Sequence, residues 1–328
     1  MKPIVIVGDA NVDLVIRLPD PNSPDIADSV PQLFFGGTGA NTAVALARLG
    51  IPVKFVGTVG DDGFGRRIRQ DFQTEGVDTS ALTVLADAFT PQVIALVKPD
   101  GERYLVIFPP VGGAQMLLER AHIPTDLIRH AAWVHTTGMC LRQSPIRETI
   151  LETMALAQSM NIPTSIDLNL RIELWGYDDL MRATVENAIR HSSVVFGSAD
   201  EEIIPVSGES TLEAAARKLS DNQRIIVARR GAAGAYAYLP TGEMLHAPAL
   251  PATVIDTIGA GDAFNGGFLA ALGERGFALD SESIDTALHT GNAVAAYKIA
   301  RAGARALPTR DDALIAAALS RRHRPNNW

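Results

Sequence analysis

The chain has 328 residues, of which 47% are hydrophobic and 20% charged, and its formal net charge is −8. Such a composition is typical of an ordinary globular protein, and the length suits one large α/β domain, alone or with a small appendage. The acidic balance disfavours nucleic acid or an anionic membrane as a partner. The only cysteine, Cys140, cannot form an internal disulfide or a cysteine-rich zinc site. Since the N-terminal segment lacks a signal-peptide pattern and no run of about 18 apolar residues occurs, we expect a cytoplasmic protein.

Short runs rich in β-branched residues recur along the chain and predict buried strands. They lie at 4–7, 53–56, 133–136, 164–167, 194–196 and 225–228. Most alternate with longer stretches of helical period, of which 40–50, 145–160 and 211–220 are examples. This alternation predicts a mostly parallel sheet with helices on both faces.

Two segments interrupt the alternation. Residues 12–19 and 30–37 are strand-like, and 92–110 reads as a β-hairpin with "PDG" at its turn. We place these strands in a small sheet that stands off the main one, with about 12–37 and 92–110 forming a lid over a site. The alternative is a hairpin without a role.

The stretch "DTIGAGDAF" (256–264) has the composition of an anion-binding loop at a helix start. Gly259, Ala260 and Gly261 let backbone N–H groups converge without side-chain obstruction, and the first amides of a helix are unpaired. Asp262 would repel a phosphate held there, so it is either an N-cap residue or a general base that accepts a proton from an attacking hydroxyl. In the second interpretation the helix N-terminus keeps Asp262 ionised at neutral pH.

Competing phosphate and hydrolase motifs are absent. No Gly-Lys pair occurs, which excludes a Walker loop, and "GGTGANT" (36–42) lacks the third glycine of a dinucleotide loop. The chain contains neither a Gly-x-Ser-x-Gly elbow nor a His-Glu-x-x-His motif.

Two separated signatures resemble those of the PfkB, or ribokinase-like, carbohydrate kinases. "DTIGAGDAF" is similar to the C-terminal signature, "GGTGANTAVALARLG" (36–50) to the N-terminal one, and "VGTVGDDGFG" (56–65) to the segment after it. Further similarities run from "GDANVD" (8–13) to "GNAVAA" (291–296) and "PTRDDAL" (308–314), so the resemblance covers essentially the whole chain. It implies one ribokinase-like domain over 1–328, an αβα sandwich with a mostly parallel central sheet and a small β-sheet lid.

The resemblance also implies an activity and site residues. The activity is transfer of the γ-phosphoryl group of ATP, with Mg²⁺, to a sugar hydroxyl, in which Asp262 is the base and the amides of 259–261 surround the phosphoryl group. The other implied residues are Asn11, Asp13, Gly37 and Asn41 for the substrate, Arg229, Gly231, Gly234 and Asn292 for the nucleotide, Glu202 for Mg²⁺ through water, and Asp256 for a monovalent cation, K⁺. Without the resemblance, "GDANVD" would be read as a strand-end turn, Asn41 as a helix-start residue, Gly231 and Gly234 as a hairpin turn, and Asn292 as a polar helix residue.

Two positions depart from the family pattern. In "ADEE" (199–202), Ala199 replaces the usual Asn, and Arg229 stands where a Thr or Ser commonly contacts ATP. Neither departure touches the base, so we expect activity with altered nucleotide contacts.

The substrate is less tightly defined by the sequence. "DLNLRIELW" (167–175) is similar to a segment of fructokinases and 2-keto-3-deoxygluconate kinases, in which Arg171 would contact the sugar. The "FPP" at 108–110 replaces the Tyr-Arg of those lids, which leaves only Arg171 for an anionic sugar acid. We therefore expect a neutral ketohexose such as fructose, with ribose, 2-keto-3-deoxygluconate or a nucleoside as alternatives.

A non-catalytic sugar sensor on the same fold is the alternative of another class, but Asp262 and its small loop are both retained. Lid sheets in the family often pair between protomers, which implies a homodimer. The apolar stretches at 33–35 and 104–108 fit such pairing, or could face the chain's own cleft.

Overall fold

The computed structural model describes residues 1–18, 30–98 and 102–313, and the expected "PDG" turn (99–101) lies outside them. In the described part, nine strands form a main sheet in the order β13-β12-β11-β10-β9-β8-β1-β4-β5. Their bounds are β1 Ile4–Val7, β4 Val53–Gly60, β5 Asp78–Leu85, β8 Trp133–Thr137, β9 Thr164–Asp167, β10 Val194–Ser198, β11 Ile225–Arg229, β12 Ala235–Tyr238 and β13 Met244–Ala247. The six predicted strand runs are all confirmed, and neighbours from β5 to β11 pair in parallel. Strands β12 and β13 add an antiparallel edge.

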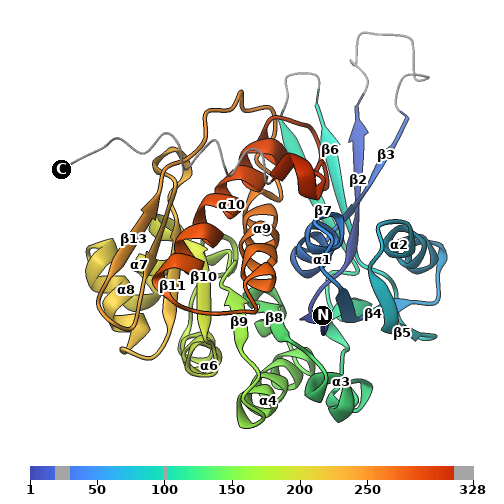
Figure 1. The fold of residues 1–328 in the computed structure, drawn as a ribbon. Coiled ribbons are helices and arrows are strands. Elements are labelled where there is room, and N and C mark those ends of the chain that lie inside the picture. The colour runs from blue at the N-terminus through green and yellow to red at the C-terminus, as the bar shows by residue number, and fades with distance from the viewer. Residues whose placement is uncertain (19–29, 99–101, 314–328) are drawn as a thin grey trace.

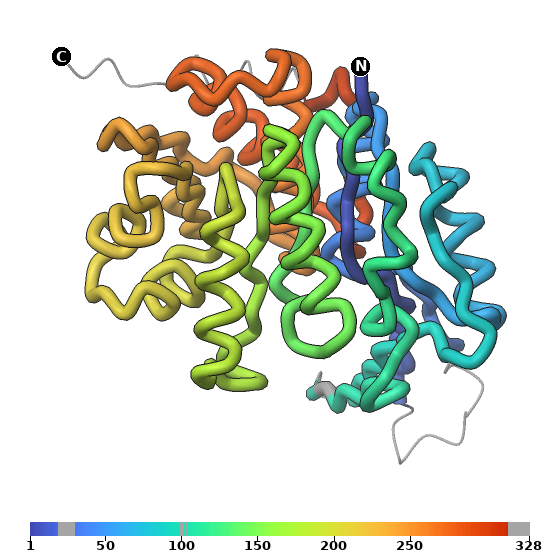
Figure 2. The backbone as a smooth tube through the Cα atoms, turned by 90° about the horizontal axis from the view of Figure 1, so that it is seen from below, coloured from blue at the N-terminus to red at the C-terminus, as the bar shows by residue number. Residues whose placement is uncertain are grey.

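Helices cover both faces of this sheet, as predicted (Figures 1 and 2). On one face lie α1 Thr38–Arg48, α2 Gly63–Thr74, α9 Ala260–Glu274 and α10 Ser281–Ile299; on the other lie α3 Thr125–Arg129, α4 Ile146–Ser159, α6 Asp179–Arg190, α7 Ile204–Ser207 and α8 Leu212–Ser220. Strand β1 shows why two cores form: Ile4 and Ile6 point into the first, and their neighbours Val5 and Val7 into the second. The predicted ribokinase-like sandwich is confirmed.

A separate four-stranded sheet rises beside α1, in the order β3-β2-β6-β7 (Figure 1). Its strands are β2 Asn11–Arg17, β3 Gln32–Gly36, β6 Gln92–Val97 and β7 Arg103–Phe108. The segments that interrupt the alternation in the sequence therefore do form a small sheet of their own. One of its two inner strands, β2, follows β1 after only three residues, which ties the small sheet to the main sheet.

The remaining short helix is α5 Ile172–Trp175. No helix in the described ranges combines the length and the apolar character that crossing a membrane requires.

Candidate active site

The candidate site lies where the parallel strands of the main sheet end. Register pairs Thr137 with Asp167, and Ser198 with Arg229, so the last residues of β8, β9, β10 and β11 lie along one edge. The carboxyl edge of an open parallel sheet is where such folds bind ligands. The residues after β1 reach the same edge, because Asp9 accepts hydrogen bonds from Thr38 N (3.0 Å) and Gly39 N (3.1 Å) at the start of α1.

The small-residue loop meets the start of α9 at this edge. Helix α9 begins at Ala260, and its N-cap is Gly259, which has φ 77° and no side-chain cap bond. Gly259 packs so closely on Ala304 that an added Cβ would lie 2.9 Å from it. Asp262 is thus the third residue of the helix rather than its N-cap, and its carboxylate is available for another task.

Asp262 is buried and accepts a hydrogen bond from Asn41 Nδ2 at 2.8 Å. Burial raises the pKa of Asp262 to about 7; Asn41 opposes the rise, whereas Asp167 and Asp9 add to it. We expected the helix terminus to keep this carboxylate ionised at neutral pH, but burial favours its protonated form in the free protein. Desolvation outweighs the helix dipole because the charge is removed from water on every side. A group with this pKa is matched to general base catalysis near neutral pH.

Asn41 is itself held in one orientation. Its Oδ1 accepts a hydrogen bond from Arg305 Nε (3.0 Å), which turns its NH₂ group toward Asp262. Arg305 forms an ion pair with Asp71 of α2 and donates to the Gly36 carbonyl at 3.3 Å. A chain of polar contacts therefore runs from α2 to the candidate base.

Asn11 and Asp13 lie on the first strand of the small sheet, close to this group. Asn11 Nδ2 donates to Asp13 Oδ1 at 2.6 Å, and burial raises the pKa of Asp13. Both contact the neighbouring strand at Gly36, where an added Cβ would lie 2.6 Å from Asp13 Oδ2. Gly37 follows with φ 100°, and a side chain there would meet the Asp9 carbonyl at 2.5 Å. The structure thus brings four of the five expected substrate residues (Asn11, Asp13, Gly37 and Asn41) to one corner.

The fifth, Arg171, is the N-cap residue of α5. It is exposed at the start of α5 and adopts a left-handed backbone conformation with φ 50°. Its neighbour Asn169 is anchored to α1 by a 2.7 Å hydrogen bond to Thr38 Oγ1. The segment 167–175 thus contributes Asp167 and Asn169 to the contacts of the site.

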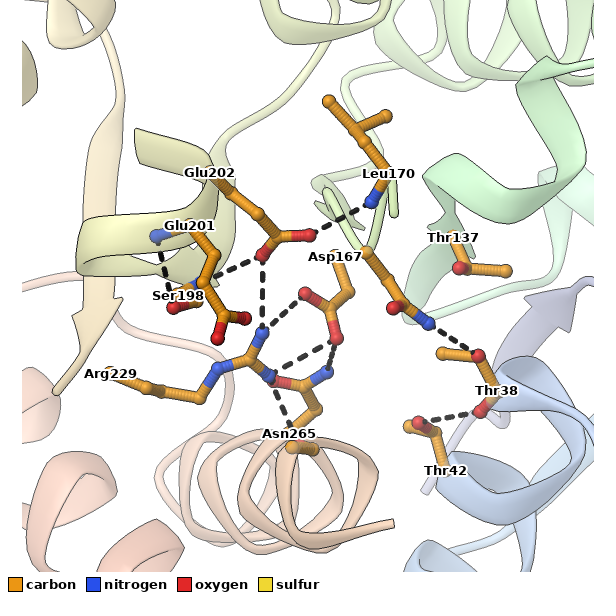
Figure 3. A network of polar contacts seen from close by, with 12 residues as sticks. Thr38, Thr42, Thr137, Asp167, Leu170, Ser198, Glu201, Glu202, Arg229 and Asn265 are labelled. Carbon is orange, nitrogen blue, oxygen red and sulfur yellow. Dashed lines mark hydrogen bonds and ion pairs between the residues drawn. The ribbon is translucent and has the colours of Figure 1, made fainter. Parts of the chain in front are cut away.

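Arg229 is the centre of a second polar cluster (Figure 3). Its guanidinium forms a two-pronged ion pair with Asp167 (2.6 and 3.1 Å) and donates to Asn265 Oδ1 (3.0 Å) and the Gly261 carbonyl (3.2 Å). Asn265 Nδ2 in turn donates to Asp167 Oδ2 at 2.7 Å. Arg229, expected at the nucleotide, therefore binds β9 to the first turns of α9 behind the small loop.

Glu202 borders the same cluster, in a π-helical turn, Ala199–Ile203, that follows β10. Its two carboxylate oxygens accept the N–H groups of Leu170 (2.8 Å) and Ser198 (2.7 Å), and Arg229 Nη2 lies 4.0 Å away. Burial, with Asp167 nearby, raises the pKa of Glu202. No group of three metal-ligating side chains occurs within 1–18, 30–98 and 102–313. A metal held by protein ligands alone does not fit here, whereas Mg²⁺ held mainly by phosphate oxygens and water does.

The expected nucleotide residues lie along the β11–β13 side. Gly231 and Gly234 flank a tight turn with φ 52° and 86°, and a Cβ on Gly234 would meet the Ala247 carbonyl at 2.2 Å. Asn292 on α10 is buried and donates to the carbonyls of Ala247 (2.8 Å) and Pro248 (3.0 Å). In the free protein this amide therefore supports the backbone beside β13.

Four site residues escaped the sequence analysis: Asp9, Asp167, Asn265 and Arg305. Asp9 and Asp167 carried a readable signal, because each comes at or just after the end of a buried strand, where parallel sheets gather polar groups. Asn265 and Arg305 carried none, since only the packing of α9 and of the loop after α10 brings them to the site.

Comparison with known proteins shows which family has this fold and these sequence features. The profile of the pfkB family carbohydrate kinases matches residues 1–310. Aminoimidazole riboside kinase from Salmonella typhimurium strain LT2 is 33% identical over 314 residues, which cover 95% of this chain and 93% of that protein. The structure of fructokinase with bound ATP from Xylella fastidiosa superposes with a TM-score of 0.86 at 27% identity, covering 98% of this chain and 99% of that one. A fructokinase double mutant from Vibrio cholerae O395, with fructose, ADP and potassium bound, gives 0.81 at 29% identity, with 96% and 98% covered.

The chain belongs to the pfkB family of carbohydrate kinases. It is an ATP-dependent sugar kinase, a phosphotransferase with an alcohol group as acceptor. The predicted family and activity are both confirmed.

Proposed function

We propose that Asp262 is the general base of phosphoryl transfer, and the observation that carries this role is its 2.8 Å contact with Asn41 beside the small-residue loop. As the sugar hydroxyl attacks the γ-phosphorus, its proton passes to Asp262, and the bond between that phosphorus and the bridging oxygen of ADP breaks. Asn41 holds the carboxylate in place while Arg305 fixes the amide.

The loop at Gly259, Ala260 and Gly261 stabilises charge on the transferred group. The Ala260 amide donates to the Thr257 carbonyl at 3.2 Å, so the amides of Gly261 and Asp262, which begin the helix, are those best able to face the phosphoryl oxygens. Mg²⁺ bound to the phosphates, with Glu202 reaching it through water, would neutralise part of the phosphate charge. Gly231, Gly234 and Asn292 line the side where we place the nucleotide.

We propose a neutral ketohexose, with fructose first, as the sugar. Three carboxylates lie near one another at the candidate sugar corner, because Asp9 interacts electrostatically with both Asp13 and Asp262. Arg305, next to them, is paired with Asp71, and Arg229 is paired with Asp167. A sugar acid would bring a further negative charge to a corner where Arg305 is already paired with a carboxylate, so a polyol without charge is favoured. The fructokinases from Xylella and Vibrio agree with this choice.

A riboside is the second candidate, because the aminoimidazole riboside kinase is 33% identical to this chain. It is also uncharged and offers vicinal hydroxyls to Asn11 and Asp13, so the charge argument does not separate it from fructose. Only the fit of the aminoimidazole ring into the corner separates a riboside from fructose. The turnover of each substrate measures that fit directly.

We further propose that the enzyme works in the cytoplasm as a homodimer built through the small sheet. Register places Asp13, Phe34, Val93 and Ile107 on one face of that sheet, with Leu105 farther along it. Phe34, Leu105 and Ile107 are 39%, 65% and 48% exposed. An apolar face of this kind beside a site commonly marks an interface.

The test is ADP release over a panel of fructose, ribose, aminoimidazole riboside, 2-keto-3-deoxygluconate and common nucleosides. We expect the highest kcat/KM with fructose. Asp262→Asn should bind ATP and sugar but lose about 10²–10⁴-fold in kcat, whereas Asp61→Asn, which removes an exposed carboxylate, should not. Normal turnover by Asp262→Asn would refute the base, and sugar-induced stabilisation without ADP release by the wild type would indicate a sensor instead.

A further inference from the structure

Lys298 is buried in an unusual way. It lies one residue before the end of α10, and its side chain has 0% exposure, which is rare for lysine. Its Nζ donates to the main-chain carbonyl of Asp256 at 2.7 Å and lies 3.5 Å from Asp256 Oδ2. A buried ammonium group therefore contacts Asp256, the residue that the family resemblance assigns to a monovalent cation.

The Asp256 loop is tied closely to the end of α10. Ile255 N and Asp256 N both donate to the Ile299 carbonyl, at 2.8 and 3.1 Å. Asp256 Oδ1 accepts from Ile258 N (3.0 Å) and Oδ2 from Gly303 N (2.8 Å). The ammonium lies within this set of contacts, and only three residues after Asp256 the chain becomes the small-residue loop.

These contacts disfavour K⁺ at Asp256. The oxygens that this residue could offer an ion, its carbonyl and its carboxylate, already face the Lys298 ammonium or accept backbone N–H groups. A second cation in contact with the same oxygens would meet the repulsion of this ammonium at short range.

We propose that the Lys298 ammonium is a built-in monovalent cation, which fixes the loop 256–261 in its phosphoryl-binding shape and makes the enzyme independent of added K⁺. The double mutant of fructokinase from Vibrio cholerae O395, by contrast, was solved with potassium bound. Lys298 is a positioning residue: it acts on the transferred group through the loop and touches no substrate. Its loss should therefore lower kcat more than it changes the KM for the sugar.

The test compares wild type and Lys298→Met in tetramethylammonium, sodium and potassium chloride at equal ionic strength. Wild-type kcat should vary less than about twofold among the three salts. Lys298→Met should lose about tenfold or more of kcat in tetramethylammonium chloride and recover part of it in potassium chloride. Lys54→Met, which removes a lysine paired with Asp78 at 2.9 Å on another part of the surface, should behave as the wild type does.

Thermal unfolding gives a second result that needs no turnover. The Tm of Lys298→Met should rise with KCl beyond the rise in tetramethylammonium chloride, and the wild-type Tm should not. Wild-type activity or Tm that depends specifically on K⁺ would overturn the proposal, even if Lys298→Met failed to fold. Full activity of Lys298→Met without K⁺ would overturn it too. If no sugar in the panel were phosphorylated, the two Tm series would still decide the role of Lys298.

Discussion

The carboxyl group of Asp262 lies in the first turn of α9 and receives a hydrogen bond from Asn41 Nδ2. Two opposed effects act on it: burial and the nearby carboxylates favour the protonated form, whereas Asn41 favours the ionised form. With its pKa raised to about 7 in the free protein, the proposed base titrates near neutral pH. Small changes in its surroundings should therefore move the enzyme's pH optimum.

Changing Asn41 should shift that pH dependence in a defined direction. The wild-type kcat/KM for the sugar should fall as the pH drops below about 7, since the base must be ionised to accept a proton. In Asn41→Ala the hydrogen bond that lowers the pKa of Asp262 is gone, so the acid limb should move upward by about one pH unit. A full pH profile distinguishes this shift of the acid limb from a loss of sugar binding, which would lower kcat/KM at every pH.

Gln70→Ala, a change on the exposed face of α2, serves as the control. Its kcat/KM should fall at the same acidic pH as that of the wild type. If the limb of Asn41→Ala stayed in place or moved to lower pH, the contact would not govern the protonation of Asp262.

At the scale of elements, the approach of α1 to α9 brings Asn41 to Asp262. Gly266 makes this approach close, because an added Cβ there would lie only 2.4 Å from Ala45 Cβ. A wider spacing would separate a donor and an acceptor that are now 2.8 Å apart.

Gly266→Ala should therefore both destabilise and slow the enzyme. We expect overpacking to cost about 1–3 kcal/mol in the free energy of unfolding, measured with urea, together with a lower kcat. Gly63→Ala is the matched control: it also adds a methyl group to a helical glycine, but nothing lies within 4 Å of its added Cβ. It should be neutral or mildly stabilising. Equal stability of the two variants would show that the helices can shift apart without cost.

Sequence patterns predicted the elements unevenly. Runs such as 4–7 and 225–228 were readable because a strand buried on both faces is apolar throughout. β5 and β13 were missed because they are the edge strands and mix polar with apolar residues, and β12 because its four residues, AYAY, are too short a run without β-branched residues. The small sheet was found because its strands break the alternation with helices.

The exposed apolar face of the small sheet matters at the scale of the whole molecule. Asn11 and Asp13 share that sheet with Leu105 and Ile107, so an interface there would also hold in place the strand that we propose binds the sugar. Association and catalysis would then be linked.

Leu105→Glu should separate the proposed dimer. A charge on this 65% exposed position would have to be desolvated in the interface, so we expect a monomer in sedimentation velocity and a higher KM for the sugar. Met244→Glu makes the same change at a 51% exposed residue of β13 and should leave the oligomeric state unchanged. A wild type that sediments as a monomer at micromolar concentration would disprove the interface.

The sequence by itself determined the sandwich, the small sheet, the family and the loop around Asp262. All of these depend on local order along the chain: strand and helix periods, and small residues at fixed spacing. Only the tertiary structure decided the pKa of Asp262, the pairing of Arg229 with Asp167 and the presence of Lys298 on Asp256. The residues that form these contacts lie 42 to 221 positions apart in the sequence. No local sequence pattern specifies which residues so far apart will meet, so burial and charge pairing depend on the tertiary structure.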